Sequence, residues 1–153
     1  MNRGLNTWLL LIIAAGVGYV AFSEYQKRQY VSDVSENMRR QVVADGIRFS
    51  IPHRNGVANY FSENESFPIA VSQLDISASQ SIRPHGVLSV DLRAHGQVAV
   101  ILSGSTLGLS YSDGEPVLLF TPEEKDGVLS WRCAGDGALA EHADLLPSAC
   151  RAR

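Results

Sequence analysis

The residues with the most distinctive chemistry in this chain are two cysteines, Cys133 and Cys150, close to the C-terminus. They are the only cysteines among 153 residues, and a bond between them would close a loop of 18 residues. In an exported domain an isolated pair of this kind usually forms a disulfide. Closing a loop of this length stabilises a fold by roughly 3 kcal/mol on the chain-entropy account. We therefore predict an intramolecular disulfide.

The other reactive side chains indicate neither a metal site nor a catalytic centre. The histidines lack the spacing of metal ligands; they are His53, His85, His95 and His142. The chain contains no G-x-S-x-G, P-loop, H-E-x-x-H or C-x-x-C pattern. His142 lies close to Asp144, but no nucleophile accompanies the two. The sequence therefore predicts a protein that is not an enzyme and that holds no metal or cofactor.

The segment from Leu5 to Ser23 has nineteen consecutive positions without a charge, between Arg3 and Glu24. A helix of that length reaches nearly 30 Å, about the hydrocarbon thickness of a bilayer. Because a helix satisfies its own backbone groups, we expect this segment to be a membrane-embedded helix. Arg3 favours a cytoplasmic N-terminus, with everything after Glu24 on the far side.

Three interpretations of this apolar segment remain open. A cleaved secretory signal would have a shorter apolar core and a small-x-small cleavage site, and the end of this run, Y-V-A-F-S-E-Y, offers none. A permanent single-pass anchor is the simplest alternative. The third is a helix that waits in the membrane and later becomes the core of a fibre.

Composition limits the remaining chain to one domain of about 130 residues beyond the membrane segment. After residue 23 there are 12 basic and 16 acidic side chains, which gives a formal charge of −4. A basic field across the whole fold, as in a nucleic-acid-binding protein, is therefore absent.

Residues 24–64 are predicted to continue the helix as an amphipathic segment. Apolar residues recur at near-helical intervals and form one stripe, composed of Val31, Val34, Met38, Val42 and Ile47. We expect this stripe, and specifically Val34, Met38 and Val42, to face a sheet. Pro52 predicts a kink or break near Ile51–Gly56, and Phe67-Pro68 closes the helical part.

Residues 65–153 have the pattern of a loop followed by an antiparallel sheet. Short strand-like runs follow one another at about ten-residue spacing, separated by turn residues. They are Gly86–Leu92, with Leu88, Val90 and Leu92 on one face, then Gln97–Leu102, Leu107–Tyr111, Val117–Thr121 and Val128–Cys133. The predicted fold class is α+β: a long N-terminal helix packed on a four- to five-stranded antiparallel sheet. The domains are then 1–23, 24–64 and 65–153.

Several motifs give the chain a resemblance to the type IV pilins. The C-terminal part, with Thr121-Pro122, a turn at Gly127, W-x-C ending at Cys133 and L-P-x-x-C ending at Cys150, resembles the end of that family. The helix end V-A-N-Y-F-S-E-N-E-S-F-P and the earlier E-Y-Q and Y-V-S-D-V-S-E segments resemble the family as well. The similarity covers most of the chain and implies a pilin-like fold.

The N-terminus departs from the family pattern. M-N-R-G would be a very short leader, cleaved after Gly4, and the fifth position after it would be Leu9 where pilins have a glutamate. In the family that glutamate is thought to meet the amine of an adjacent subunit. The resemblance therefore implies a minor or divergent pilin.

The function that this resemblance implies is structural, as a subunit of a type IV pilus or related fibre that serves adhesion, motility or DNA uptake. Its partners would be other pilin subunits, the membrane and the pilus assembly machinery. Its location would be the bacterial inner membrane, with a periplasmic C-terminal domain, and the extracellular space once in a fibre. The residues expected to mediate fibre and membrane contacts are Leu5, Leu9, Leu10, Ile12, Ile13, Val17, Val20 and Phe22. Those expected to form a surface-recognition loop are Asp136, Glu141, His142 and Asp144.

Two alternative functions remain open. One is a single-pass accessory protein of the envelope that never enters a fibre, which the missing glutamate favours. The other is a DNA-binding pilin of the competence type. The latter needs clustered basic residues, yet Leu102–Ala149 contains only Lys125 and Arg132. A nucleic-acid partner is therefore not favoured.

Overall fold

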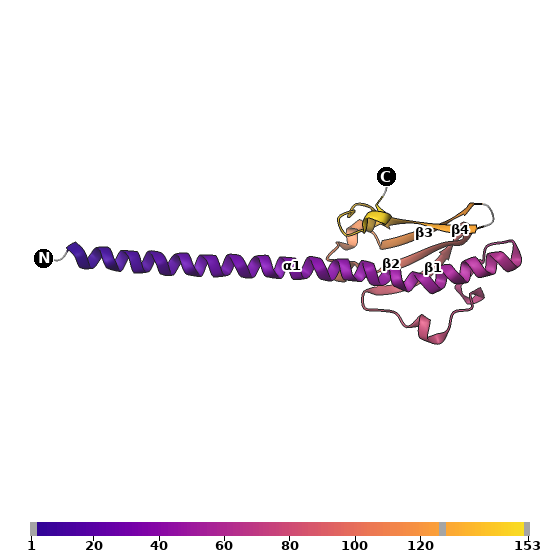
Figure 1. Ribbon diagram of the computed structural model, residues 1–153, viewed down its shortest axis with the longest axis horizontal. Coiled ribbons are helices and arrows are strands. Elements are labelled where there is room, and N and C mark those ends of the chain that lie inside the picture. Colours follow the sequence, from indigo (N-terminus) through magenta and orange to yellow (C-terminus); the bar gives the residue numbers. More distant parts are fainter. Residues whose placement is uncertain (1–2, 126–127, 152–153) are drawn as a thin grey trace. The chain divides into compact units, whose positions relative to one another are not determined.

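The computed structural model describes residues 3–125 and 128–151, and describes no side chains for residues 1–21, 23, 27–34 and 111. The chain divides into two units, residues 1–38 and residues 39–153. Helix α1 (Arg3–Asn64) makes up the first unit and continues into the second, which also contains all the strands (Figure 1). The second unit contains the hydrophobic core of the described residues.

Within the second unit, α1 lies on the sheet through a stripe of small and branched side chains. Val42, Val43 and Val57 are 0–3% exposed and belong to the core that the helix forms with the strands. The prediction that Val42 faces the sheet is confirmed. The prediction for Met38 is wrong, because its side chain is 54% exposed; Val34 lies outside the described side chains. The helix residues that contact the core therefore begin at Val42 and Val43 and do not include Met38.

Gly46 allows α1 to approach the strands closely. A Cβ at this position would lie 2.9 Å from a methyl carbon of Leu102 and 3.0 Å from one of Leu118. Pro52 does not break the helix, which is assigned without interruption from Arg3 to Asn64. Of the predicted kink or break, the break is therefore wrong, and the kink stays a prediction. The helix is packed against the core on both sides of Pro52, and such tertiary packing outweighs local propensity.

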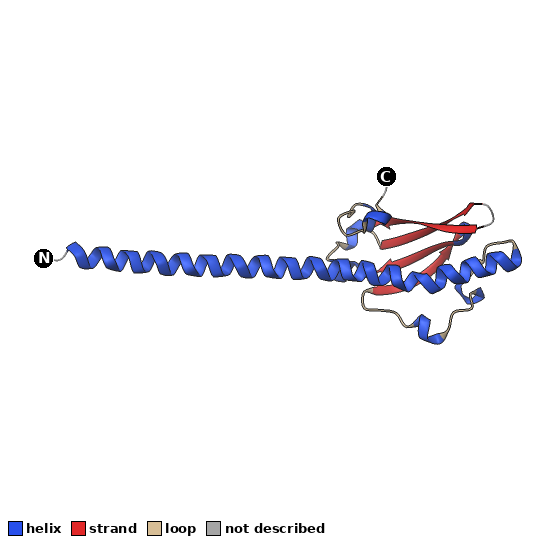
Figure 2. Cartoon of the chain, viewed as in Figure 1, coloured by secondary structure: helices blue, strands red, loops and turns tan. Residues whose placement is uncertain are grey.

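The sheet has four antiparallel strands in the sequential order β1-β2-β3-β4 (Figure 2). The strands are β1 (Val87–Arg93), β2 (Gln97–Leu102), β3 (Pro116–Lys125) and β4 (Val128–Gly137). The α+β class and the antiparallel meander are confirmed. Strand β2, one of the two inner strands, is buried from Val98 to Leu102, in keeping with its almost wholly apolar sequence.

The predicted strand over Leu107–Tyr111 is wrong. That region contains instead a one-turn helix, α2 (Gly104–Leu107), followed by a 3₁₀ turn at Tyr111–Asp113. The hydroxyl of Ser103 accepts a hydrogen bond from the Thr106 backbone and caps α2, while Gly108 ends it in the left-handed conformation. These capping residues outweigh the short apolar alternation in the sequence.

Strand β1 contains an irregularity that moves one predicted core residue to the surface. The pairing with β2 shifts register between Val87 and Ser89, as in a β-bulge. Val90 and Leu92 pack against the core as predicted, but Leu88 is 49% exposed. Because the extra residue interrupts the alternation, Leu88 lies off the face that Val90 and Leu92 share.

The segment between α1 and β1 forms no strand and contains two 3₁₀ turns, Val71–Gln73 and Ala78–Ser81. Its first part folds back on the end of α1. The rings of Phe61 and Phe67 stack with centroids 4.6 Å apart, and the Gln73 side chain donates to the Tyr60 hydroxyl. These contacts fix the path of the chain as it leaves the helix.

A search of the described residues finds no helix with both the length and the apolar character needed to span a bilayer. The predicted membrane segment, Leu5–Ser23, lies almost wholly outside the described side chains. Its role in a membrane stays a prediction.

Candidate functional site

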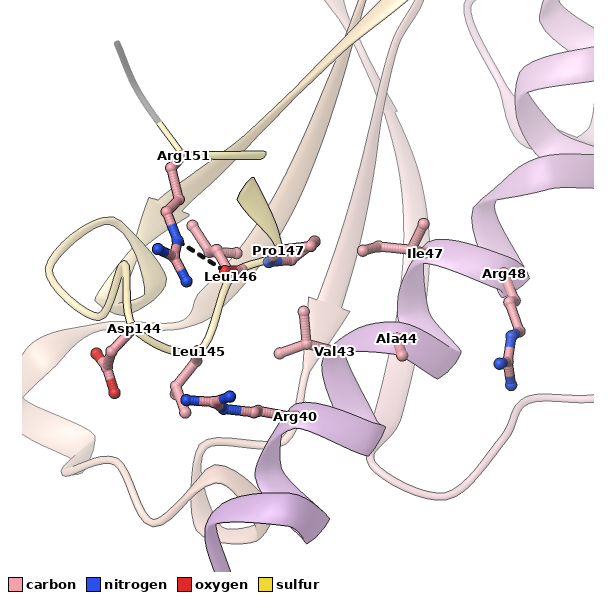
Figure 3. Close-up of a pocket in the computed structure, with 10 residues that line it drawn as sticks. All are labelled: Arg40, Val43, Ala44, Ile47, Arg48, Asp144, Leu145, Leu146, Pro147 and Arg151. Carbon is pink, nitrogen blue, oxygen red and sulfur yellow. Dashed lines mark hydrogen bonds between the residues drawn. The ribbon is translucent and has the colours of Figure 1, made fainter. Parts of the chain in front are cut away.

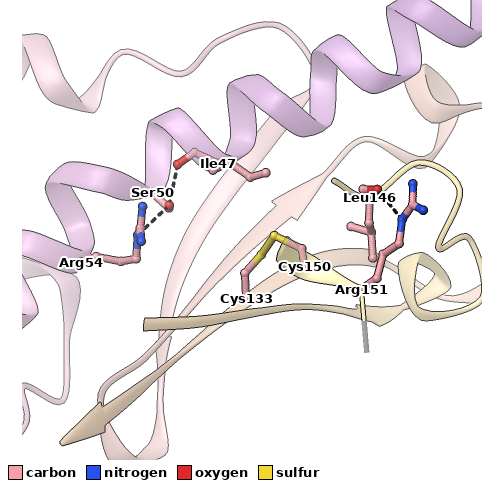
Figure 4. Close-up of a disulfide and its surroundings, with 7 residues drawn as sticks. All are labelled: Ile47, Ser50, Arg54, Cys133, Leu146, Cys150 and Arg151. Carbon is pink, nitrogen blue, oxygen red and sulfur yellow. Dashed lines mark hydrogen bonds between the residues drawn. A yellow bond between two sulfur atoms is a disulfide. The ribbon is translucent and has the colours of Figure 1, made fainter. Parts of the chain in front are cut away.

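The C-terminal segment is fastened to the last strand by a disulfide between Cys133 on β4 and Cys150 (Figure 4). Cys150 is 3% exposed and lies in a final 3₁₀ turn, Ser148–Cys150. The predicted disulfide and the loop that it closes are confirmed. The bond holds residues 134–149 as a defined surface beside the sheet.

A glycine in β4 lets this loop pack over the strand. A Cβ at Gly135 would lie 2.7 Å from the backbone oxygen of Leu139 and 2.9 Å from a methyl carbon of Leu146. Leu139, Leu145 and Leu146 are at most 4% exposed and belong to the main core. The loop is therefore part of the hydrophobic core and is not only held by the disulfide.

Between α1 and this loop lies a groove of about 480 Å³ (Figure 3). One wall is a single face of α1, because its residues follow the i, i+3, i+4, i+7, i+8 pattern. The opposite wall comes from the C-terminal loop. The apolar lining residues are Val43, Ala44, Ile47, Leu145, Leu146 and Pro147, and the charged ones are Arg40, Arg48, Asp144 and Arg151. We refer to these ten residues as the α1–loop groove.

The charged side chains of the α1–loop groove are three arginines and one aspartate, in a chain that is acidic overall. Arg151 donates from Nε to the Leu146 carbonyl oxygen at 2.9 Å, which fixes the direction of its guanidinium group (Figure 3). Arg48 lies 3.3 Å from the Asp45 carboxylate. The α1–loop groove therefore combines an apolar floor with a rim of mixed charge, on which three arginines stand beside Asp144 and Asp45.

The four residues predicted to form a recognition loop differ in their surroundings. Only Asp144 lines the α1–loop groove. Asp136 lies on β4 and accepts a hydrogen bond of 2.6 Å from Arg93. Glu141 is exposed and His142 is half-buried, and neither lines the groove.

The ion pair with Arg93 lowers the pKa of the Asp136 carboxyl below its ordinary value. The hydrogen bond from Arg93 is the main cause, and a second hydrogen bond from the Gly137 backbone acts in the same direction. Asp136 is therefore engaged within its own chain and is less suited to recognise a ligand than Asp144.

Arg54, on α1, places its guanidinium group against aromatic rings of the sheet, near the disulfide (Figure 4). Its Cζ atom lies 4.7 Å from the centroid of the Phe120 ring and 6.0 Å from that of Trp131. Its Nε donates to the hydroxyl of Ser50, which is fully buried. Burial lowers the pKa of Arg54 from its ordinary value. This side chain bridges helix and sheet through cation–π contacts.

The predicted assembly residues cannot be placed in a site, since their side chains are outside the description except for Phe22. Phe22 is 59% exposed. The others are Leu5, Leu9, Leu10, Ile12, Ile13, Val17 and Val20. Gly4, the predicted cleavage position, also lies outside the described side chains.

Sequence reasoning missed the arginines of the α1–loop groove. None of the three, Arg40, Arg48 and Arg151, is among the residues that the sequence predicts to form a site. A signal was present in the spacing of Arg40 and Arg48, which lie eight residues apart on one helix face, and in the position of Arg151 directly after Cys150.

The described residues contain no group of three or more histidine, cysteine or acidic side chains placed to hold a metal ion. Comparison of the chain with models of known protein families finds no match, and comparison with curated proteins finds none.

Proposed function

We propose that this protein is a divergent, pilin-like subunit of an extracellular fibre related to type IV pili. The observation that carries the proposal is the combination of an N-terminal helix, a sequential four-stranded antiparallel sheet and a C-terminal loop fastened to β4 by Cys133–Cys150. The motifs around Thr121-Pro122, W-x-C and L-P-x-x-C support the same family resemblance.

In this proposal the apolar segment Leu5–Phe22 holds the subunit in the membrane and then bundles with neighbouring helices in the fibre core. The long helix thus serves assembly, while residues 39–153 form a head that contacts other subunits or a surface. Leu9, in place of a glutamate, removes one charged contact from the helix bundle. The subunit is therefore expected to be scarce in fibres relative to a main pilin.

The alternative is a membrane-anchored accessory protein that stays out of the fibre. The N-terminus of the mature protein distinguishes the two. Intact-mass measurement on protein purified from its own host should give a chain that begins at Leu5, as expected for a processed pilin. A chain that retains Met1 through Gly4 in a host with an active prepilin peptidase would support the accessory function instead.

A further inference from the structure

The head carries two surfaces of complementary chemistry, one beside the start of its part of α1 and one directly after the end of α1. One is the α1–loop groove, whose helix wall begins at Arg40. The other is the segment from Glu63 to Ile69, where the chain leaves α1. Glu63 follows Arg40 by 23 positions, which corresponds to about 35 Å along the helix.

The surface at the end of α1 combines charge with an exposed apolar side chain. Glu63 and Glu65 are exposed and form no ion pair within the described residues. Ile69 is 87% exposed, more than any other large apolar side chain in the described part of the chain. We refer to Glu63–Ile69 as the post-helix knob.

The post-helix knob is held in shape by specific contacts. The Gln73 side chain accepts from the backbone nitrogens of Ile69, at 2.7 Å, and Ala70, at 3.0 Å, and donates to the Tyr60 hydroxyl. Phe67 stacks on Phe61 at the end of the helix. A surface that is already ordered loses little conformational entropy when it binds a partner.

The α1–loop groove offers an apolar cavity and basic side chains, which match the exposed isoleucine and the glutamates of the post-helix knob. Its floor is aliphatic, and its rim carries three arginines, with Asp144 as the only acidic lining residue and Asp45 beside Arg48. A volume of about 480 Å³ leaves room for an isoleucine side chain and flanking carboxylates. Ile69 would enter the apolar part, and Glu63 and Glu65 would face the arginines.

We propose that the post-helix knob of one subunit docks into the α1–loop groove of a second copy of this chain, head to tail. Two different surfaces make this contact, so it is heterologous. It places copies of this chain next to one another within a fibre whose main subunit is another pilin. The docking also supplies a charged contact between subunits, and it compensates for the charged contact that Leu9, in place of a glutamate, removes from the helix bundle. This inference rests on the proposed fibre function.

Disulfide crosslinking of full-length chains tests the contact. Ile69→Cys combined with Pro147→Cys, a lining residue of the groove, should give a ladder of crosslinked oligomers after mild oxidation. Ile82→Cys combined with Pro147→Cys is the matched control, because Ile82 is 75% exposed in the same connection between helix and sheet. Sheared fibres and the membrane fraction are both analysed on non-reducing gels.

Charge reversal provides a second test that does not depend on cysteine geometry. In the crosslinking background, Glu65→Arg and Arg151→Glu should each reduce the oligomer ladder by roughly threefold or more, and the two together should restore it. Asp75→Arg, at an exposed acid outside the knob, should leave the ladder unchanged. Failure of the double reversal to rescue would overturn the pairing.

The outcomes separate this inference from the fibre function. Protein present in fibres without a ladder above the control overturns the docking and leaves the fibre function standing. Protein absent from fibres with a ladder in the membrane fraction supports the docking and overturns the fibre function. Absence from fibres without any ladder overturns both.

Discussion

The side chain of Arg93, on edge strand β1, donates a hydrogen bond of 2.6 Å to Asp136 on β4, the opposite edge strand. Both residues lie on the face of the sheet away from α1. Residues that pair across neighbouring strands share a face, and Asp136 pairs with Val117, which lies on that face. Residues two apart on one strand also share a face, and Arg93 is two positions after Asp91, the partner of Ala99. The ion pair therefore crosses the two central strands. Ala99 and Val117, at most 3% exposed, lie on those strands.

The first prediction concerns the pH dependence of this ion pair. Because Arg93 lowers the pKa of Asp136, the pair stabilises the folded protein above the ordinary carboxyl pKa of about 3.9 and this contribution is lost as pH falls through the lowered pKa. Asp136→Asn should reduce the free energy of unfolding at neutral pH by no more than about 1 kcal/mol, since both side chains are more than 40% exposed.

Urea unfolding at pH 7 and below pH 3 measures this effect. The difference between the wild-type protein and Asp136→Asn should shrink at the lower pH. Asp75→Asn, at an exposed acid without a described ion pair, is the control. A difference that is larger at low pH would contradict the assignment.

The second prediction tests which residues of α1 face the sheet. Val42→Asp should lower the free energy of unfolding by several kcal/mol, because it buries a charge with no partner. Met38→Asp should change it by less than about 0.5 kcal/mol, since Met38 is largely exposed. Denaturant unfolding of the two variants measures both effects. Equal tolerance at the two positions would refute the helix register described above.

The third prediction concerns the disulfide. Cys150→Ser should reduce the free energy of unfolding by roughly 2–5 kcal/mol. The wild-type protein, unfolded without reductant, should show no reactive thiol on titration. Ser148→Ala, in the same final turn, controls for local disturbance. Two reactive thiols per wild-type chain would contradict the disulfide.

The fourth prediction concerns His53, which is 5% exposed and lies inside the α1 face that packs on the sheet. Its Nδ1–H donates to the Phe49 carbonyl oxygen at 3.0 Å. Burial lowers the pKa of His53, so the folded state favours the neutral ring. Its contribution to stability is complete above the ordinary histidine pKa of about 6.5 and declines as pH falls below that value.

Unfolding experiments between pH 5 and pH 8 check this behaviour. Wild-type stability should fall on acidification within that range, and His53→Gln should flatten the profile. His85→Gln, at an exposed histidine, is the matched control and should keep the wild-type profile. An unchanged profile in His53→Gln would assign the pH dependence to another group.

Sequence patterns were sufficient for the parts of the fold that depend on local periodicity and on pairs of unusual residues. The disulfide, the central strand Gln97–Leu102 and the end of the helix before Phe67-Pro68 were predicted correctly. Each follows from a short-range rule. The lone cysteine pair and the unbroken apolar run of β2 leave few alternatives.

The errors arose where tertiary packing decided the outcome. Met38 continued the apolar stripe in sequence, but the contact with the strands begins at Val42. Leu88 lost its core position to a bulge that alternation cannot reveal. The α1–loop groove could not be foreseen, because it forms only when α1 and the loop before Cys150 are brought together by the intervening sheet.

The fifth prediction follows from Leu9. If a glutamate normally neutralises a neighbour's amine in the fibre core, Leu9→Glu should restore that contact. An unpaired ion in hydrocarbon costs at least about 2.5 kcal/mol, which gives such a charge pair its strength. The variant should therefore enter fibres in larger amounts than the wild-type protein. Leu9→Gln, which is polar but carries no charge, is the matched control.

The central claim, that this chain is a fibre subunit, is tested most directly by its distribution between fibre and membrane. Tagged protein is quantified in fibres sheared from host cells and in the membrane fraction of the same cells. We expect wild-type protein in the sheared fibres at far below the amount of the main pilin, and more of Leu9→Glu than of Leu9→Gln. Complete absence of all three proteins from fibres, with Met1 still attached, would contradict the claim.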